Sequence, residues 1–375
     1  MEFKDLYKLN IPTKVYYGRE IWKAALSDIA DNQDILHQNV MIVTTGRSLN
    51  RLGYVQELKK YLEENTLTKQ VTVYDQISAN PKLSEVEDGV KQAKKNNVNT
   101  IVGFGGGSAI DAAKAIAAGA KSDISVSEMF RKGMEPQTVI PLIAMPTTAG
   151  TGSELSKAAI LTDEEEQKKG GLRGNNLYPN AAIVDSSFTD SVPFQITMET
   201  GFDVLAHAIE SYVSNASSPF TDMLSLYVIE HATYAIRKLI QSLADKEARD
   251  MLSMCSMIMG INLGNASTAL PHRMQYPLGA HTISSHGAGL AMLYCAWMKY
   301  EKQYSTEKVE RILKLMGCKE IKELLQDMHL TATLSDIRLT VADVEQMVSE
   351  VSGNIKNDPA AQEADVLKKI YMESL

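Results

Sequence analysis

Cysteine is scarce in this sequence, and no two cysteines lie close together. The 375 residues contain three, Cys255, Cys295 and Cys318, and no Cys-x-x-Cys pair. An odd number at such wide spacing argues against both a disulfide framework and a zinc site built from cysteine. Because unpaired thiols suit a reducing compartment, we expect a cytoplasmic protein.

The sequence also lacks long hydrophobic runs and an excess of basic residues. Its start, MEFKDLYKLNIPTK, has no apolar core of the kind that export signals need, so we expect no export. The longest weakly polar stretch, residues 112–120, is too short to cross a bilayer. Lysine and arginine number 38 against 46 aspartates and glutamates, a net charge of −8. We therefore expect neither a membrane nor a nucleic acid as partner.

The chain does have the length and the apolar content of two globular domains. In the first half, strand-like and helix-like stretches alternate. The predicted strands are residues 14–17, 40–44, 71–74, 100–104 and 139–145, and the predicted helices are residues 55–61, 83–96 and 111–120. Short alternation of this kind predicts an α/β domain with a mainly parallel sheet and helices on both faces.

The second half differs, because no convincing strand follows Asp185. The spacing of apolar residues predicts helices at residues 197–213, 222–243, 246–260, 308–316, 321–328 and 341–351. We therefore expect an α/β domain over residues 1–185 and an all-α domain over residues 186–375. The charged run at residues 163–169, DEEEQKK, is most simply a solvated turn.

A glycine-rich turn follows the predicted strand at residues 100–104 and opens the next helix. It contains Gly106, Gly107 and Ser108, and glycine lets the backbone approach a phosphate closely. The helix start then offers free N–H groups and a partial positive charge. The spacing is not that of the GxGxxG fingerprint, and such a turn can also be purely structural. Its place at the carboxyl end of a parallel strand favours a phosphate site.

A second polar loop follows the predicted strand that ends at Met145. Residues 146–154, PTTAGTGSE, combine hydroxyl side chains with two glycines, so they can wrap a ribose or a phosphate. By itself this segment is only a polar loop. Together, the two loops favour a bound nucleotide.

Three histidines and one aspartate form a candidate metal site. Asp203 and His207 are four residues apart, which places both side chains on one face of a helix, and His272 and His286 follow. Three imidazoles and a carboxylate suit a borderline divalent metal such as Fe(II) or Zn(II). Spacing alone leaves two alternatives open: a plain hydrogen bond between Asp203 and His207, or His281 as ligand in place of His286.

The order of these motifs resembles that of the iron-containing (group III) alcohol dehydrogenase family. The glycine loop, PTTAGTGSE, GFDVLAHAIESYVS at residues 201–214 and the His-x13-His-Gly stretch ending at Gly287 carry the resemblance, which covers essentially the whole chain. The HGAGLA segment from His286 is most similar to the butanol-dehydrogenase-like branch. The resemblance implies an enzyme that transfers hydride between NAD(P)H and a small alcohol or aldehyde. It also implies a Rossmann-like first domain within a dehydroquinate synthase-like architecture.

The resemblance further assigns residues to roles. It implies that the metal ligands are Asp203, His207, His272 and His286. It implies that the dinucleotide contacts Asn80, Gly106, Gly107, Ser108, Asp111, Thr147, Thr148, Thr151 and Lys169. In this scheme the glycine loop holds the pyrophosphate, Asn80 lines the adenine side and Lys169 reaches the nicotinamide ribose. Family habit also implies a homodimer or a larger homo-oligomer.

One position departs from the family pattern at the centre of the chemistry. Many members carry a second histidine, near the nicotinamide, four residues after the third metal ligand, where this sequence has Tyr276. A phenol is a poorer proton acceptor than an imidazole at neutral pH. Tyr276 is therefore a catalytic candidate with three open interpretations: it hydrogen-bonds the substrate, the proton leaves through water, or the enzyme prefers another substrate.

The segment after the second predicted strand bears on the choice of dinucleotide. Members that prefer NAD(H) tend to carry an acidic residue there for the ribose hydroxyls, whereas residues 44–48, TTGRS, contain none. Arg47 and Ser48 can instead hold a 2′-phosphate, so we expect NADP(H) to be favoured over NAD(H). The alternative is that Arg47 is simply a solvated turn residue.

Other functions fit parts of the pattern. Metal-dependent glycerol or glycerol phosphate dehydrogenases and dehydroquinate synthase-like lyases are related classes, but the PTTAGTGSE and HGAGLA segments argue against them. A metal- or nucleotide-binding protein without turnover is the non-enzymatic alternative, and only Tyr276 points to it.

Overall fold

The computed structural model describes residues 9–33, 35–36 and 38–375, which divide into two compact units. The α/β unit comprises residues 11–148 and 153–189. The helical unit comprises residues 190–375, residues 149–152 and residues 9–10. Each unit has its own core of buried apolar side chains.

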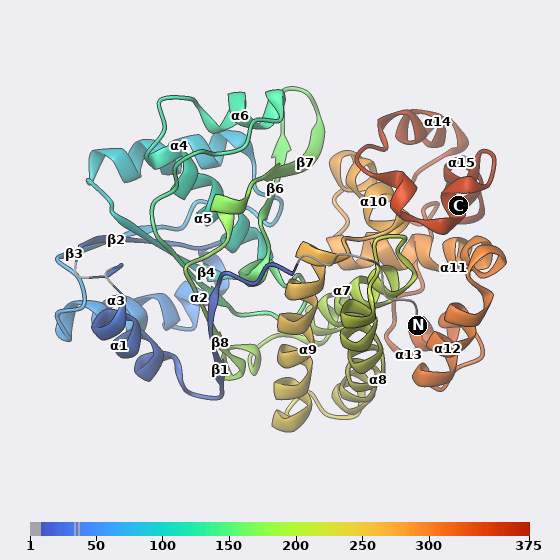
Figure 1. The fold of residues 1–375 in the computed structure, drawn as a ribbon, viewed down its shortest axis with the longest axis horizontal. Coiled ribbons are helices and arrows are strands. Elements are labelled where there is room, and N and C mark those ends of the chain that lie inside the picture. The colour runs from blue at the N-terminus through green and yellow to red at the C-terminus, as the bar shows by residue number, and fades with distance from the viewer. Residues whose placement is uncertain (1–8, 34, 37) are drawn as a thin grey trace. The chain divides into compact units, whose positions relative to one another are not determined.

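A parallel sheet forms the centre of the α/β unit (Figure 1). Its described strands are β1 (Lys14–Gly18), β2 (Asn39–Val43), β3 (Gln70–Tyr74), β4 (Thr100–Gly105), β5 (Leu142–Pro146) and β8 (Ala181–Asp185). They lie in the order β1-β8-β5-β4-β2-β3, and each neighbouring pair is parallel. Every residue of β4, β5 and β8 is buried, as expected for interior parallel strands that are covered on both faces. The predicted parallel sheet is confirmed.

Helices cover both faces of this sheet. They are α1 (Trp22–Asn32), α2 (Arg47–Arg51), α3 (Tyr54–Glu64), α4 (Leu83–Lys95), α5 (Gly107–Ala120) and α6 (Val126–Lys132). Side chains alternate between the two faces along a strand. Val40 and Ile42 of β2 therefore pack in one core cluster with α1 and α3, whereas Met41 and Val43 pack in another with α4 and α5. The predicted two-sided arrangement is confirmed.

Several features of the α/β unit have no counterpart among the predicted elements: the helices α1, α2 and α6, the strand β8, and an antiparallel hairpin of β6 (Ala158–Asp163) and β7 (Lys168–Arg173). β8 is central, because it joins β1 to β5. The carboxylate of Asp185 at its end accepts the backbone N–H groups of residues 20–22, at 2.8, 2.7 and 3.0 Å. It thereby caps the start of α1.

The charged run at residues 163–169 forms the turn of the β6–β7 hairpin. The expectation of a solvated turn is right for residues 164–168, which are exposed, and wrong for the two ends. Asp163 is 0% exposed and Lys169 is 7% exposed. Lys169 is buried because side chains alternate along β7, so that Lys168 points outward and Lys169 inward.

The helical unit contains α7 (Phe194–Val213), α8 (Pro219–Gln241), α9 (Lys246–Asn265), α10 (Leu270–His281), α11 (His286–Tyr304), α12 (Thr306–Met316), α13 (Ile321–Asp327), α14 (Val341–Glu350) and α15 (Val366–Glu373). Among its described residues there is no strand, as expected. Across the described chain, no helix combines the length and the apolar character that crossing a membrane would require.

α7 packs against α8, α9 and α11, so most of it is enclosed. From Gly201 to Val213 every residue is buried. A helix enclosed on all sides must satisfy its polar side chains inside the protein. Asp203, His207 and Glu210 lie one turn apart on one face, so α7 carries three ionisable groups into the interior.

Candidate metal centre and nucleotide loops

One carboxylate oxygen of α7 faces the imidazole nitrogens of three histidines. Asp203 Oδ1 lies 3.7 Å from His207 Nδ1, which is one helical turn away on α7. It lies 3.4 Å from His272 Nε2, in α10, and 3.5 Å from His286 Nε2, at the first residue of α11. The structure therefore brings together in the helical unit the four residues predicted as ligands.

The donor set fits a divalent metal ion. Among the described residues, Asp203 Oδ1, His207 Nδ1 and His272 Nε2 are buried and have no hydrogen-bond partner. Burying such atoms without a partner is unfavourable, unless something else satisfies them. The candidate ligand atoms of these three residues lie within 4.8 Å of one another, and three nitrogens with one oxygen are typical of Zn(II) or Fe(II) sites.

The two alternatives left open by the spacing receive no support from the geometry. The 3.7 Å between His207 Nδ1 and Asp203 Oδ1 is too long for a hydrogen bond. His281 is engaged elsewhere, because its Nε2 lies 2.6 Å from Glu350 Oε2, on α14.

Each histidine of the cluster has a second partner that orients its ring. His272 Nδ1 lies 2.7 Å from Glu210 Oε1, and His286 Nδ1 lies 2.6 Å from Gln275 Oε1. His207 hydrogen-bonds the backbone of Gly150, in the second predicted loop. Such outer partners fix the ring that binds a metal and tune its basicity.

Glu210 and Gln275 are absent from the sequence predictions. Glu210 had a signal, since it follows Asp203 by seven residues on the same helix face. Its second oxygen accepts the N–H of Ala269 at 2.8 Å, which ties α7 to the start of α10. No sequence signal identified Gln275, because its contact with His286 depends on how α10 and α11 fold back on each other.

The cluster is electrostatically coupled. Burial by itself raises the pKa of Asp203, but the facing histidines outweigh it and hold that pKa well below its usual range. Burial lowers the pKa of His207 to about 4, against the opposing pull of Asp203. Burial also acts to lower the pKa of His272, but Glu210 and Asp203 raise it to about 10. A bound metal must displace any proton held on these nitrogens.

The glycine loop joins β4 to α5 in the α/β unit, as predicted. A Cβ at Gly105 would lie 2.7 Å from the Ala109 side chain, and one at Gly106 would lie 3.2 Å from Thr148 Oγ1. The tight turn therefore requires glycine at Gly105, and the two predicted loops meet where Gly106 approaches Thr148. Thr147 is buried beside it, with its N–H donated to the Gly105 carbonyl at 3.0 Å.

Three further predicted cofactor residues of the α/β unit, Ser108, Asn80 and Lys169, lie close to this turn or to the loop before α4. Ser108 Oγ donates to the carbonyl of Ala79, the residue before Asn80. Asn80 Oδ1 accepts a hydrogen bond from Lys169 Nζ at 3.0 Å. Thr151 belongs to the helical unit, in the segment of residues 149–152.

The Asp111 carboxylate is buried and is held by hydrogen bonds within the α/β unit. Its carboxylate accepts hydrogen bonds from Ser153 Oγ and from the N–H of Ile160 in β6, and it lies 3.7 Å from Lys114 Nζ. Lys114, which no sequence signal identified, is 0% exposed and donates to Ser153 Oγ and Ser156 Oγ. Asp111 therefore links α5 to the second loop and to the hairpin, and its role toward the cofactor stays a prediction.

The remaining predicted residues are Arg47, Ser48 and Tyr276. Arg47 and Ser48 are exposed at the start of α2, directly after β2. Because β2, β4 and β5 are parallel, their carboxyl ends lie at one edge of the sheet, together with both loops. Tyr276 lies one turn after His272 on α10 and is 9% exposed.

Two family models match nearly the whole chain. "Iron-containing alcohol dehydrogenase" matches residues 12–186, and "Fe-containing alcohol dehydrogenase family, C-terminal" matches residues 197–375. The chain belongs to the iron-containing alcohol dehydrogenase family. It is therefore an oxidoreductase that acts on CH–OH groups.

Individual relatives agree with this assignment. The NADPH-dependent butanol dehydrogenase of Clostridium saccharobutylicum is 27% identical over 98% of this chain and 97% of its own. The iron-containing alcohol dehydrogenase of Thermotoga maritima is 27% identical, with a TM-score of 0.89 over 99% of both chains. The sulfoacetaldehyde reductase of Bifidobacterium kashiwanohense, solved in complex with NAD+, is 27% identical, with a TM-score of 0.87 over 99% of both. The predicted family and two-part architecture are confirmed.

Replacing Glu210 by Gln should weaken metal binding by about 10- to 100-fold, because a neutral amide polarises the His272 ring less than a carboxylate does. The measurement is the dissociation constant of the metal-free protein for Zn(II), by competition with a chromophoric chelator. Glu199→Gln is the matched control, since Glu199 lies on the same helix but bonds Gln195. Equal constants in wild type and Glu210→Gln would contradict this role.

Proposed function

We propose that the protein reduces small aldehydes to alcohols with NADPH, and catalyses the reverse oxidation, using Fe(II) or Zn(II) held by Asp203, His207, His272 and His286. The observation that carries the proposal is the buried carboxylate oxygen Asp203 Oδ1, which faces three imidazoles and has no hydrogen-bond partner among the described residues. When bound, the metal supplies Lewis-acid polarisation of the substrate oxygen, and the nicotinamide supplies or accepts the hydride.

The α/β unit supplies the dinucleotide site in this proposal. Gly106, Gly107 and Ser108 present backbone N–H groups and the start of α5 to the pyrophosphate. Thr147 and Thr148 of the second loop contact the middle of the cofactor, Asn80 lines its adenine side and Lys169 reaches the nicotinamide ribose. These residues bind and orient the dinucleotide, and a fixed orientation is itself a large part of catalysis.

Arg47 and Ser48 favour NADPH over NADH. A guanidinium and a hydroxyl at the end of β2 can form charge-assisted hydrogen bonds with a 2′-phosphate, and residues 44–48 contain no carboxylate to bind ribose hydroxyls instead. The full-length similarity to an enzyme named for NADPH supports the same choice.

Tyr276 is the proposed proton donor in the reducing direction. Reduction of a carbonyl leaves charge on oxygen that a hydroxyl group can stabilise by donating a hydrogen bond. Tyr276 has a buried side chain one turn from His272. A donor suits aldehyde reduction better than alcohol oxidation.

Iron-reconstituted protein should oxidise NADPH faster than NADH when it is given short-chain aldehydes. In Arg47→Ala, the KM for NADPH should rise about tenfold or more, while the KM for NADH stays unchanged, because only the 2′-phosphate loses a charged partner. Arg51→Ala, at the other end of the same short helix, is the control and should change neither. Absence of turnover in metal-loaded protein, or an equal loss with both dinucleotides, would contradict the proposal.

Tyr276→Phe should lower kcat for aldehyde reduction about tenfold or more, with metal content and NADPH affinity unchanged, because only the hydroxyl is removed. Steady-state kinetics with parallel metal analysis and dinucleotide titration provide the test. Unchanged kcat would show that the hydroxyl has no part in the reaction.

A further inference from the structure

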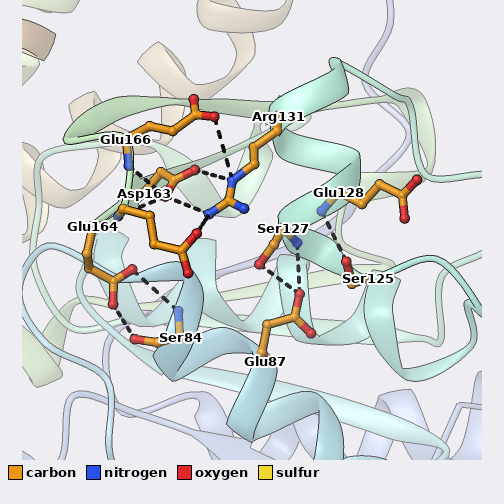
Figure 2. Close-up of polar contacts among 10 residues, drawn as sticks. Ser84, Glu87, Ser125, Ser127, Glu128, Arg131, Asp163, Glu164 and Glu166 are labelled. Carbon is orange, nitrogen blue, oxygen red and sulfur yellow. Dashed lines mark hydrogen bonds and ion pairs between the residues drawn. The ribbon is translucent and has the colours of Figure 1, made fainter.

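An arginine holds the turn of the β6–β7 hairpin (Figure 2). Arg131, in α6, donates from Nε to Asp163 Oδ2 at 2.6 Å and from Nη2 to Asp163 Oδ1 at 2.9 Å. Its Nη2 also lies 2.7 Å from Glu165 Oε2. This bidentate contact is geometrically specific, because a planar guanidinium matches a carboxylate in only a few orientations.

Asp163 also shapes the turn from within. Its Oδ1 accepts the N–H groups of Glu165 and Glu166 at 3.1 and 3.3 Å. The Asp163 side chain is 1% exposed, whereas that of Arg131 is 33% exposed. The contact with Arg131 lowers the pKa of Asp163 although burial acts to raise it, so the carboxylate stays charged. Because the Asp163 carboxylate is buried and charged, removing its partner Arg131 would be unfavourable.

A hydrogen bond joins the same turn to α4. Glu164 accepts a hydrogen bond from Ser84 Oγ, in the first turn of that helix (Figure 2). The next residue, Glu85, accepts the N–H groups of Ser78 and Lys82 at 3.0 and 3.1 Å. The start of α4 therefore holds both the hairpin turn and the loop that contains Asn80.

The hairpin in turn fixes Lys169. Strand register pairs Asp163 with Lys168 and Thr162 with Lys169, so Lys169 is one step from the anchored turn. Thr162 donates its N–H to the Pro81 carbonyl at 2.8 Å. This hydrogen bond holds the hairpin against the loop that contains Asn80. Lys169 Nζ then reaches Asn80 Oδ1 at 3.0 Å.

We propose that Arg131 and Asp163 are positioning residues for dinucleotide binding: their ion pair fixes the hairpin so that Lys169 and Asn80 are held ready for the cofactor. This inference rests on the proposed function, which places both residues at the dinucleotide. Without the anchor, ordering the hairpin becomes part of the free energy of binding, and affinity falls. The metal cluster is built from residues of the helical unit alone, so its occupancy is independent of this anchor.

The test compares Asp163→Asn and Arg131→Met with wild type in metal-loaded protein. NADPH binding is measured directly by fluorescence titration, beside kcat, KM, metal content and thermal stability. Both variants should raise the dissociation constant and the KM for NADPH about tenfold, with kcat within about twofold and metal content unchanged. The double variant should be no worse than either single one, because both remove the same interaction. Arg131→Lys should restore part of the affinity, since it keeps the charge without the planar fork.

Lys132→Met is the matched control. It removes a cation from the next position of α6, where Lys132 forms an exposed ion pair with Glu128 at 2.8 Å. It should leave NADPH affinity unchanged.

The outcomes separate the two claims. If wild type binds no dinucleotide, the proposed function fails and this inference falls with it. If wild type binds NADPH and the variants bind it equally well, only the inference is overturned. It is also overturned if kcat and metal content fall together with affinity, which indicates general loss of structure. Should Asp163→Asn not fold, Arg131→Met decides alone, because unchanged NADPH affinity in that variant contradicts the positioning role.

Discussion

The interior of the helical unit holds a carboxylate oxygen, Asp203 Oδ1, that has no hydrogen-bond partner among the described residues. Asp203 Oδ1 faces three histidine nitrogens at 3.4–3.7 Å, among described residues that offer it no hydrogen bond. Such an arrangement is unfavourable in itself, and an ion bound at the centre would make it favourable. The enclosure of α7, the Glu210 contact between α7 and α10, and the contact between Gln275 and His286 all serve to keep these groups facing one another.

The α/β unit uses buried charge in a different way. Asp111 with Lys114, and Asp163 with Arg131, are ionic contacts in which the partners are already present in the protein. Both join the hairpin to other elements, the first at its base on α5 and the second at its turn on α6. These two pairs are satisfied internally and hold loops in place, whereas Asp203 Oδ1 in the helical unit has no hydrogen-bond partner among the described residues. This contrast distinguishes the proposed positioning groups from the proposed metal ligands.

The sequence was sufficient for those features whose signal is local. The spacing of Asp203 and His207, the glycine loop after an apolar strand, and the helices α7, α8, α9, α12, α13 and α14 were predictable, because each depends on residues within a few turns. The spacing of apolar residues did not predict α10 or α11, which carry His272 and His286. β8 was missed because AAIVD is short and continuously apolar, without the alternation that marks a half-buried strand. β7 was missed because KKGGLR has little strand propensity and is stabilised by pairing with β6.

Glu210 and His272 lie 62 residues apart, and Arg131 and Asp163 lie 32 apart, so these contacts arise only from the folded topology. The metal, the dinucleotide preference, the cytoplasmic location and the homo-oligomer stay predictions.

The central claim is that the four-residue cluster is a catalytic metal site, separate from the residues that bind dinucleotide. The most direct measurement is the metal content of wild type and of His207→Ala, each paired with turnover and NADPH titration of the same preparation. The account predicts about one divalent metal per chain in wild type, as in other catalytic sites of this ligand type. In His207→Ala it predicts that most metal and most turnover are lost, while NADPH still binds. A His207→Ala protein that keeps its metal and its metal-dependent turnover would contradict the account.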